Sequence, residues 1–177
     1  AVTLNEKNIY RGKPKQKNLD NRDDLILHEM AHVLGFGTLW SRMDLILGAG
    51  TANPTFVGAN AMREYASLSD RAEPTSVPVA NTGGAGTRDG HWRESVFGNE
   101  LLTGFLSGAT RPISLMSILA FEDMGYQVNH AAADPFELPS SLFLAEMGLM
   151  GDRSSSDTCV IHRIEPIILP PTAMVNS

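Results

Sequence analysis

Cysteine is nearly absent from this sequence of 177 residues, which contains Cys159 alone. A single thiol excludes an intrachain disulfide and any metal site built from four cysteines, although a chain without disulfides can be cytosolic or secreted. Long hydrophobic runs are also missing, and no stretch approaches the ~18 apolar residues of a membrane-spanning helix. The first residues lack the basic start and apolar core of a signal peptide. We therefore expect a folded protein without a transmembrane segment or a signal peptide.

Positive charge is scarce as well. The 14 lysines and arginines are outnumbered by 20 aspartates and glutamates, which gives a formal net charge of −6. An acidic chain is poorly suited to nucleic acid, because binding there depends on neutralising phosphates. The glycine-rich stretch at 81–86 lacks the lysine and the preceding strand of a phosphate-binding loop. We therefore expect no nucleic-acid partner and no phosphate site of this type.

The apolar residues predict one domain that is mainly α-helical with irregular loops. The strongest helix is predicted over about residues 21–34. Asp20 or Asn21 can cap its start, and Gly35 follows its last turn. Apolar side chains occupy nearly the whole circumference of this helix, and such a distribution is typical of a helix buried on all sides.

A second long helix is predicted over about residues 112–124, because Pro112 stands near its start and Gly125 follows its end. Shorter elements are expected as helices at 41–47, 60–68 and 140–147 and as an extended piece at 77–79. Residues 1–19 show no periodic pattern and are interpreted as an irregular arm. Residues 148–177 are interpreted as a tail or as the start of a following segment.

The predicted buried helix carries the run His28-Glu29-Met30-Ala31-His32. His28 and His32 are one helical turn apart on the same face, so two imidazoles can bind one ion. Glu29 points about 100° away around the helix, where it can reach a water on that ion without being a ligand. Burying these polar groups on an apolar helix is costly unless they are paired or metal-bound. The run therefore predicts a metal centre with Glu29 as a general base.

Catalytic zinc usually takes three protein ligands, so one more has to be found. Gly35 occupies the glycine position of the metzincin pattern H-E-x-x-H-x-x-G-x-x-H, but the third histidine position is Thr38. His91, which follows the glycine-rich loop, is one candidate. Glu64 is its rival, because zinc peptidases of another large class take a glutamate from a downstream helix. The remaining histidines are interpreted as solvated or structural: His130 and His162.

Four segments together resemble the leishmanolysin family of metzincin zinc peptidases, and the likeness covers roughly residues 20–130. These segments are the run from His28 to Gly35, the pair His91-Trp92, the run Asn99-Glu100-Leu101, and the helix end Phe121-Glu122-Asp123-Met124-Gly125-Tyr126. In that family a long insertion after the glycine displaces the third histidine. The resemblance therefore favours His91 over Glu64.

The resemblance implies a zinc endopeptidase with one catalytic ion on His28, His32 and His91. A zinc-bound water would attack a peptide bond of a polypeptide substrate, with Glu29 as the general base. The family's methionine, in a tight turn beneath the metal, corresponds to Leu102, which fills the same apolar volume. The resemblance also implies a secreted or cell-surface protein. Calcium stays undetermined at this level.

The family pattern also implies a division of the chain. Residues 20–147 would form a metzincin-like peptidase portion, with an insertion at about 39–90. Metzincins carry an N-terminal subdomain whose sheet edge binds substrate, yet only 27 residues precede His28. We therefore expect most of that subdomain to be absent from this chain, so that a preceding segment or a partner chain supplies it. The single cysteine is consistent with the disulfide-poor, bacterial-type members.

A non-catalytic zinc-binding module, or an inactive fragment of a larger peptidase assembly, is the alternative. The lack of an N-terminal sheet favours this alternative. Glu29 argues against it, since a site that only holds the fold has no use for a base. A structural zinc site also normally closes its fourth position with cysteine or histidine, and no fourth ligand is evident in the sequence.

Overall fold

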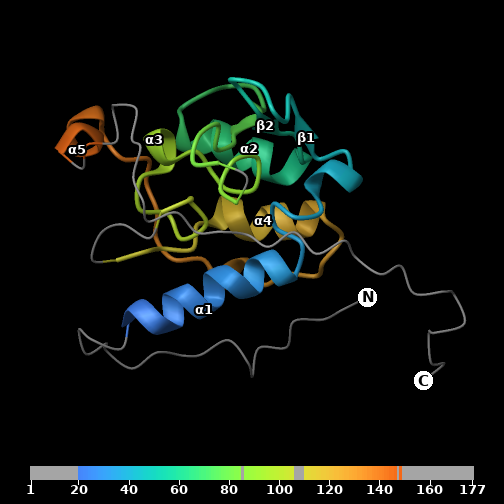
Figure 1. Ribbon diagram of the computed structural model, residues 1–177, viewed down its shortest axis with the longest axis horizontal. Coiled ribbons are helices and arrows are strands. Elements are labelled where there is room, and N and C mark those ends of the chain that lie inside the picture. The colour runs from blue at the N-terminus through green and yellow to red at the C-terminus, as the bar shows by residue number, and fades with distance from the viewer. Residues whose placement is uncertain (1–19, 85, 106–109, 147, 149–177) are drawn as a thin grey trace, which may run out of the picture.

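The computed structural model describes residues 20–84, 86–105, 110–146 and 148 (Figure 1). The arm expected at 1–19 and the tail from 149 onward lie outside these residues. The described part is mostly helical with long loops and one small sheet, which agrees with the expected mainly α class. Its elements are α1 (Asp20–Val33), the 3₁₀ helix η1 (Trp40–Arg42), β1 (Ile46–Leu47), β2 (Thr55–Phe56), α2 (Ala59–Leu68), β3 (Val77–Pro78), α3 (Glu94–Phe97), α4 (Leu115–Asp123), the 3₁₀ helix η2 (His130–Ala132) and α5 (Ser141–Glu146).

Helix α1 forms within one residue of the predicted bounds, but the prediction that it is buried on all sides is wrong. It lies along one side of the described fold (Figure 1) and buries only the face with His28, Ala31 and His32. Apolar side chains on its other faces are exposed, and Ile26 is 58% and Val33 86% accessible. Periodicity identifies apolar side chains but does not show whether a neighbouring element covers each of them. The buried face therefore carries the histidines.

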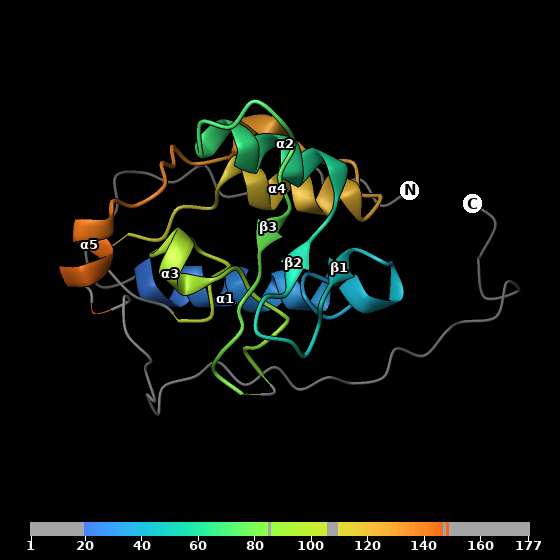
Figure 2. The same ribbon diagram turned by 90° about the horizontal axis from the view of Figure 1, so that it is seen from above.

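Helix α4 begins later than predicted, at Leu115, because the side chain of Ser114 caps it by accepting a hydrogen bond from the Ser117 N–H at 3.2 Å. Gly125, with φ +92°, follows its end as expected. Helix α2 packs against α4 (Figure 2). The carboxylate of Asp123 fixes this contact, since it accepts hydrogen bonds from the first N–H groups of α2. In Figure 1 both helices lie on the same side of α1.

The helix predicted at 41–47 is wrong. The chain there forms the last residues of η1 and then strand β1, and Asp44 between them takes a left-handed backbone conformation with φ 55° that a continuous helix does not allow. The chain then enters an antiparallel sheet of order β1-β2-β3, with Ile46 opposite Phe56 and Phe56 opposite Val77. The sequence pattern indicated an extended piece at 77–79 but no sheet, because strands of two residues are too short to show alternation.

An aromatic cluster forms the centre of the core and joins the segment after α1 to the sheet and to α4. Phe36 contacts Trp40 with ring centroids 4.6 Å apart, and Trp40 contacts Phe56 at 4.9 Å. Trp92 contacts Phe36 at 5.1 Å and is wholly buried. Buried aromatic pairs of this kind contribute about 0.5–1.5 kcal/mol each beyond their area. Trp92, the residue after His91, is therefore anchored in the hydrophobic core.

No helix in the described part of the chain combines the length and the apolar character needed to cross a bilayer.

Candidate metal centre

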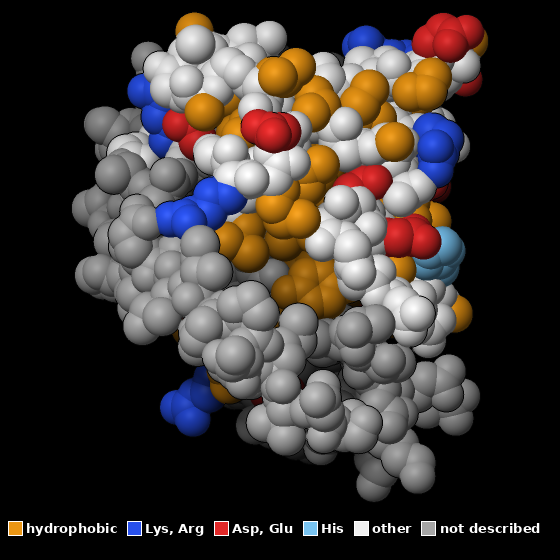
Figure 3. All heavy atoms as spheres, turned by 90° about the vertical axis from the view of Figure 1, so that its right-hand side faces the viewer, with side chains coloured by type: hydrophobic (Ala, Val, Ile, Leu, Met, Phe, Trp, Pro, Cys, Tyr) orange, Lys and Arg blue, Asp and Glu red, His pale blue; other side chains and the backbone are white. Residues whose placement is uncertain are grey.

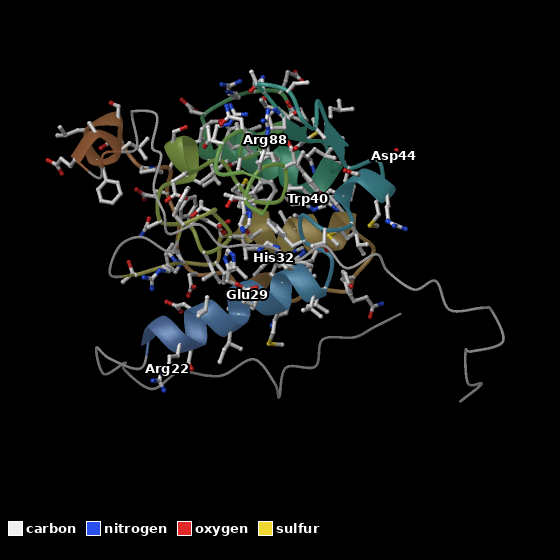
Figure 4. All side chains as sticks on the ribbon, in the orientation of Figure 1. Arg22, Glu29, His32, Trp40, Asp44 and Arg88 are labelled. Atoms are coloured by element: carbon white, nitrogen blue, oxygen red, sulfur yellow. The ribbon has the colours of Figure 1, made fainter. Side chains whose placement is uncertain are left out.

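Three histidines converge at the inner face of α1. The Nε2 atom of His32 lies 3.1 Å from that of His28 and 3.0 Å from that of His91, and the third distance, between His28 and His91, is 3.2 Å. All three side chains are buried. Figure 4 shows His32 between α1 and the rest of the fold. Among the described residues, these three form the one group of potential metal ligands.

The other nitrogen of each ring is fixed by a backbone carbonyl. His28 Nδ1 lies 2.8 Å from the Leu101 oxygen, His32 Nδ1 lies 2.9 Å from the Phe36 oxygen, and His91 Nδ1 lies 3.0 Å from the Thr87 oxygen. A carbonyl only accepts, so each Nδ1 must carry the proton and donate it. In a neutral ring the Nε2 atom is then unprotonated. Three lone pairs consequently face one another with no hydrogen between them.

This arrangement fits a divalent metal. Three nitrogens at ~2.0–2.1 Å from one tetrahedral zinc ion lie about 3.3 Å apart, close to the observed separations. A ligating histidine typically donates its other N–H to a carbonyl or carboxylate, which orients the ring. Without a cation, the three converging lone pairs repel one another. The donor set, three neutral imidazoles, suits zinc.

Burial keeps these rings neutral. It lowers the pKa of His28, lowers the pKa of His91 well below the ordinary value, and lowers that of His32 to about 4. The neighbouring imidazoles add to the effect for His32 and His91, whereas the carbonyl partners oppose it. Neutral imidazoles are the form that binds a metal. The site is therefore ready to bind a cation at neutral pH.

The metal-free protein is expected to lose stability as the pH falls from about 6.5 towards 4. An unfolded histidine has a pKa near 6.5, and folded His32 has one of about 4. Between these values the unfolded chain binds more protons than the folded chain, so stability present above pH 6.5 decreases as the solution becomes more acidic. His32 alone accounts for ~3 kcal/mol. Denaturant unfolding of chelator-treated protein at several pH values measures this, and a flat profile would contradict it.

Two glycines shape the chain between α1 and the third histidine. Gly35, with φ +108°, turns the chain so that the Phe36 carbonyl reaches His32, and a Cβ there would lie 2.6 Å from a Met124 side-chain atom. Gly37 approaches so closely that a Cβ would lie 2.1 Å from the Gly90 oxygen. The turn therefore meets the residue before His91. Gly35 was predicted from the sequence, and Gly37 was not.

Leu102 lies in a turn beside the cluster, where the resemblance implied a methionine. The residue before it, Leu101, provides the carbonyl that orients His28. The Leu102 side chain is wholly buried, and its carbonyl accepts a hydrogen bond from the Trp92 N–H at 3.0 Å. The turn therefore contacts both His28, through Leu101, and the segment of His91, through Leu102.

The two glutamates of the sequence analysis lie in different places. Glu29 is exposed on α1. Its negative charge partly opposes the lowering of the pKa of His28 and His32 by burial, which places it near the cluster (Figure 4). Glu64 is half-buried on α2 and is not part of the metal-ligand group. The structure therefore brings His91, and not Glu64, to the two helix histidines.

Sequence reasoning missed the three carbonyls that orient the rings. Every residue has a backbone carbonyl, so the residue type does not reveal which carbonyls accept hydrogen bonds from the histidines. It also missed the contacts of Glu100, which appeared in the sequence only as part of a run similar to a known family. The available signal was a carboxylate directly before two leucines, because a glutamate in an apolar segment is rarely buried without partners.

Comparison with known families agrees with this geometry. The family model described as leishmanolysin matches residues 3–140, which include the three histidines, Glu29 and the turn at Leu102. Comparisons with curated proteins and with solved structures gave no significant match. The matched region covers well over half of the chain, so this protein belongs to the leishmanolysin family of metallopeptidases.

Proposed function

We propose that the chain is a zinc-dependent endopeptidase in which His28, His32 and His91 hold one zinc ion and Glu29 is the general base. One observation carries the proposal. Each of three imidazoles carries its proton on Nδ1, because that nitrogen donates to a backbone carbonyl. The three unprotonated Nε2 atoms therefore point at one another. Membership of a family of zinc metallopeptidases supports the choice of metal and of reaction.

A bound zinc ion would supply a Lewis acid that polarises the scissile carbonyl and lowers the pKa of a water towards ~7. The chain itself supplies the proton acceptor. Glu29 follows His28 directly on α1, so its carboxylate projects to the side of the ligand face, within reach of a water but badly placed as a ligand. It takes the proton of the attacking water and delivers it to the leaving amine.

The number of ligands favours catalysis over a structural role. A structural zinc site closes all four positions with protein ligands, whereas a catalytic site leaves one open. Within the described residues the ligand group has three members and no cysteine. The non-catalytic module considered from the sequence therefore receives less support than the peptidase.

The described residues lack a long sheet edge with which an extended peptide substrate could pair. Each strand of the sheet has two residues, so it offers an extended peptide little edge to pair with. The outer face of α1 is apolar and exposed at Ile26, Met30 and Val33. Figure 3 shows that hydrophobic side chains also remain at the surface on another side of the molecule. We propose that a preceding subdomain or a partner chain packs on α1 and supplies the substrate edge.

A comparison of kcat/KM tests this partner. The chain alone is expected to cleave slowly, because orientation of the substrate accounts for several kcal/mol of a barrier. A form with a longer N-terminal segment should be faster and more selective at equal zinc content. Equal efficiency of the two forms would show that residues of this chain already provide the edge.

We assign residues 20–147 to the peptidase portion and residues 39–90 to an insertion between the second and third histidines. Members of the family are typically extracellular or surface-bound, and we propose the same location for this protein.

Metal removal tests the proposed reaction. Zinc-loaded protein is expected to hydrolyse an unfolded polypeptide such as reduced casein. Treatment with a chelator should abolish cleavage, and one equivalent of zinc should restore it, because the ion supplies the Lewis acid. Cleavage sites are identified by mass spectrometry of the products. Hydrolysis that persists after the metal content has fallen to background would contradict the proposal.

A further inference from the structure

Glu100 is a wholly buried carboxylate that the proposed reaction does not use. It lies at the start of the turn that carries Leu101 and Leu102, and its side chain reaches the N-terminal end of α4. Its distance from solvent makes it costly as an anion, and burial raises its pKa. A group of this kind is retained only where its partners compensate for the lost hydration.

Four hydrogen bonds provide that compensation. Oε1 accepts from the N–H of Ser114 at 3.0 Å, from its hydroxyl at 2.8 Å, and from the hydroxyl of Ser117 at 2.5 Å. Oε2 accepts from the Leu102 N–H at 2.6 Å. All four partners donate, and both serines are buried. The carboxylate therefore joins the turn to the first turn of α4, where the helix dipole also favours a negative charge.

The turn fixed in this way reaches His28. Between Glu100 and Leu102, whose N–H is bound by the carboxylate, lies Leu101, whose carbonyl accepts from His28 Nδ1 at 2.8 Å. Both flanks of that carbonyl are thus held by one side chain. A shift of the turn would move the acceptor and rotate the imidazole.

A second connection leads to His91. The Ser117 hydroxyl donates to Glu100 and accepts from the Trp92 indole N–H at 2.8 Å. Trp92 directly follows His91, and its backbone N–H donates to the Leu102 carbonyl. The side chain and the main chain of Trp92 are therefore both bound to groups that Glu100 contacts or flanks.

We propose that Glu100 is a positioning residue of the metal centre, which holds the Leu101 carbonyl against His28 and, through Ser117 and Trp92, the segment that carries His91. This inference rests on the proposed zinc site. It adds to the ligands and their carbonyl partners a carboxylate that fixes the position of one of those carbonyls. Loss of groups that orient metal ligands typically costs 10–100-fold in affinity.

Glu100→Gln tests the inference, with Asp123→Asn as the matched control. The glutamine keeps the size of the side chain, but its amide NH₂ must face a group that only donates, either the Leu102 N–H or the Ser114 N–H. We expect zinc affinity, measured by competition with a chromophoric chelator, to fall about tenfold. The visible spectrum of the cobalt-substituted protein should also change. In Asp123→Asn a carboxylate that caps α2 is lost, so stability should fall while zinc affinity stays unchanged.

The outcomes separate the two proposals. Affinity equal to wild type in Glu100→Gln, or the same loss in Asp123→Asn, would overturn the positioning role. Wild-type protein that binds no zinc would overturn the proposed function, and the inference with it. If Glu100→Gln does not fold, Ser117→Ala decides, because it removes the acceptor of Trp92 and keeps the carboxylate. Zinc affinity and cobalt spectrum unchanged in Ser117→Ala would then overturn the inference.

Discussion

Glu29→Gln should leave zinc bound while peptide hydrolysis falls by about 10²–10⁴-fold, the usual contribution of a general acid–base group. The amide preserves the shape of the side chain but cannot accept the proton of the attacking water. Glu29 is exposed on α1 and is not one of the residues whose ligand atoms converge. Its loss should therefore affect kcat and not metal content. Steady-state cleavage of a fluorogenic peptide at verified zinc occupancy measures the effect.

Glu64→Gln provides the control for this experiment. It makes the same chemical change on α2, away from the histidine group. Its activity should match that of the parent protein. Glu29→Gln with activity within a few-fold of the parent, or with its zinc lost, would exclude the assigned role.

His91→Ala should weaken zinc binding by more than about 100-fold, because loss of a ligand exceeds the 10–100-fold cost of losing a group that only orients one. Its Nε2 lies 3.0 Å from that of His32 and 3.2 Å from that of His28, so the remaining pair would offer two ligands in place of three. Equilibrium dialysis with zinc gives the affinity. Circular dichroism of the metal-free variants establishes that the fold persists.

Glu64→Ala discriminates between the two candidate third ligands. If His91 is the ligand, Glu64→Ala retains the affinity of the parent protein. Equal zinc retention in both variants would mean that neither side chain ligates. Loss in Glu64→Ala alone would restore the alternative that the sequence left open.

The sequence predicted much of the helical structure and the helix that carries His28 and His32, but not the surroundings of that helix. Residues 28–32 predict a metal centre because helical periodicity places two imidazoles on one face. The exposure of Val33 was not predictable, since it depends on which neighbours are present and not on the pattern within the helix. His91 could be preferred over Glu64 only by resemblance. Its approach depends on Gly37 and Gly90, whose contact spans 53 residues of chain.

Sheet formation shows a second limit. Pairing between Phe56 and Val77 is a long-range contact, and two-residue strands carry no local signal for it. The helix expected at 41–47 failed for a local reason that composition does not reveal, the left-handed conformation of Asp44. Both errors fall in the segment between the second and third histidines.

The three acceptors that orient the imidazoles are backbone carbonyls, which limits what a substitution can do to them. They belong to the main chain of Phe36, Thr87 and Leu101, so no substitution at these positions deletes the oxygen itself. Mutation can displace such a group only by moving the backbone. The acceptor oxygen is therefore independent of the side chain, whereas the side chains of Phe36, Thr87 and Leu101 are themselves buried and are constrained by packing. The positions under strict constraint also include those that set the path of the backbone, such as Gly35 and Gly37.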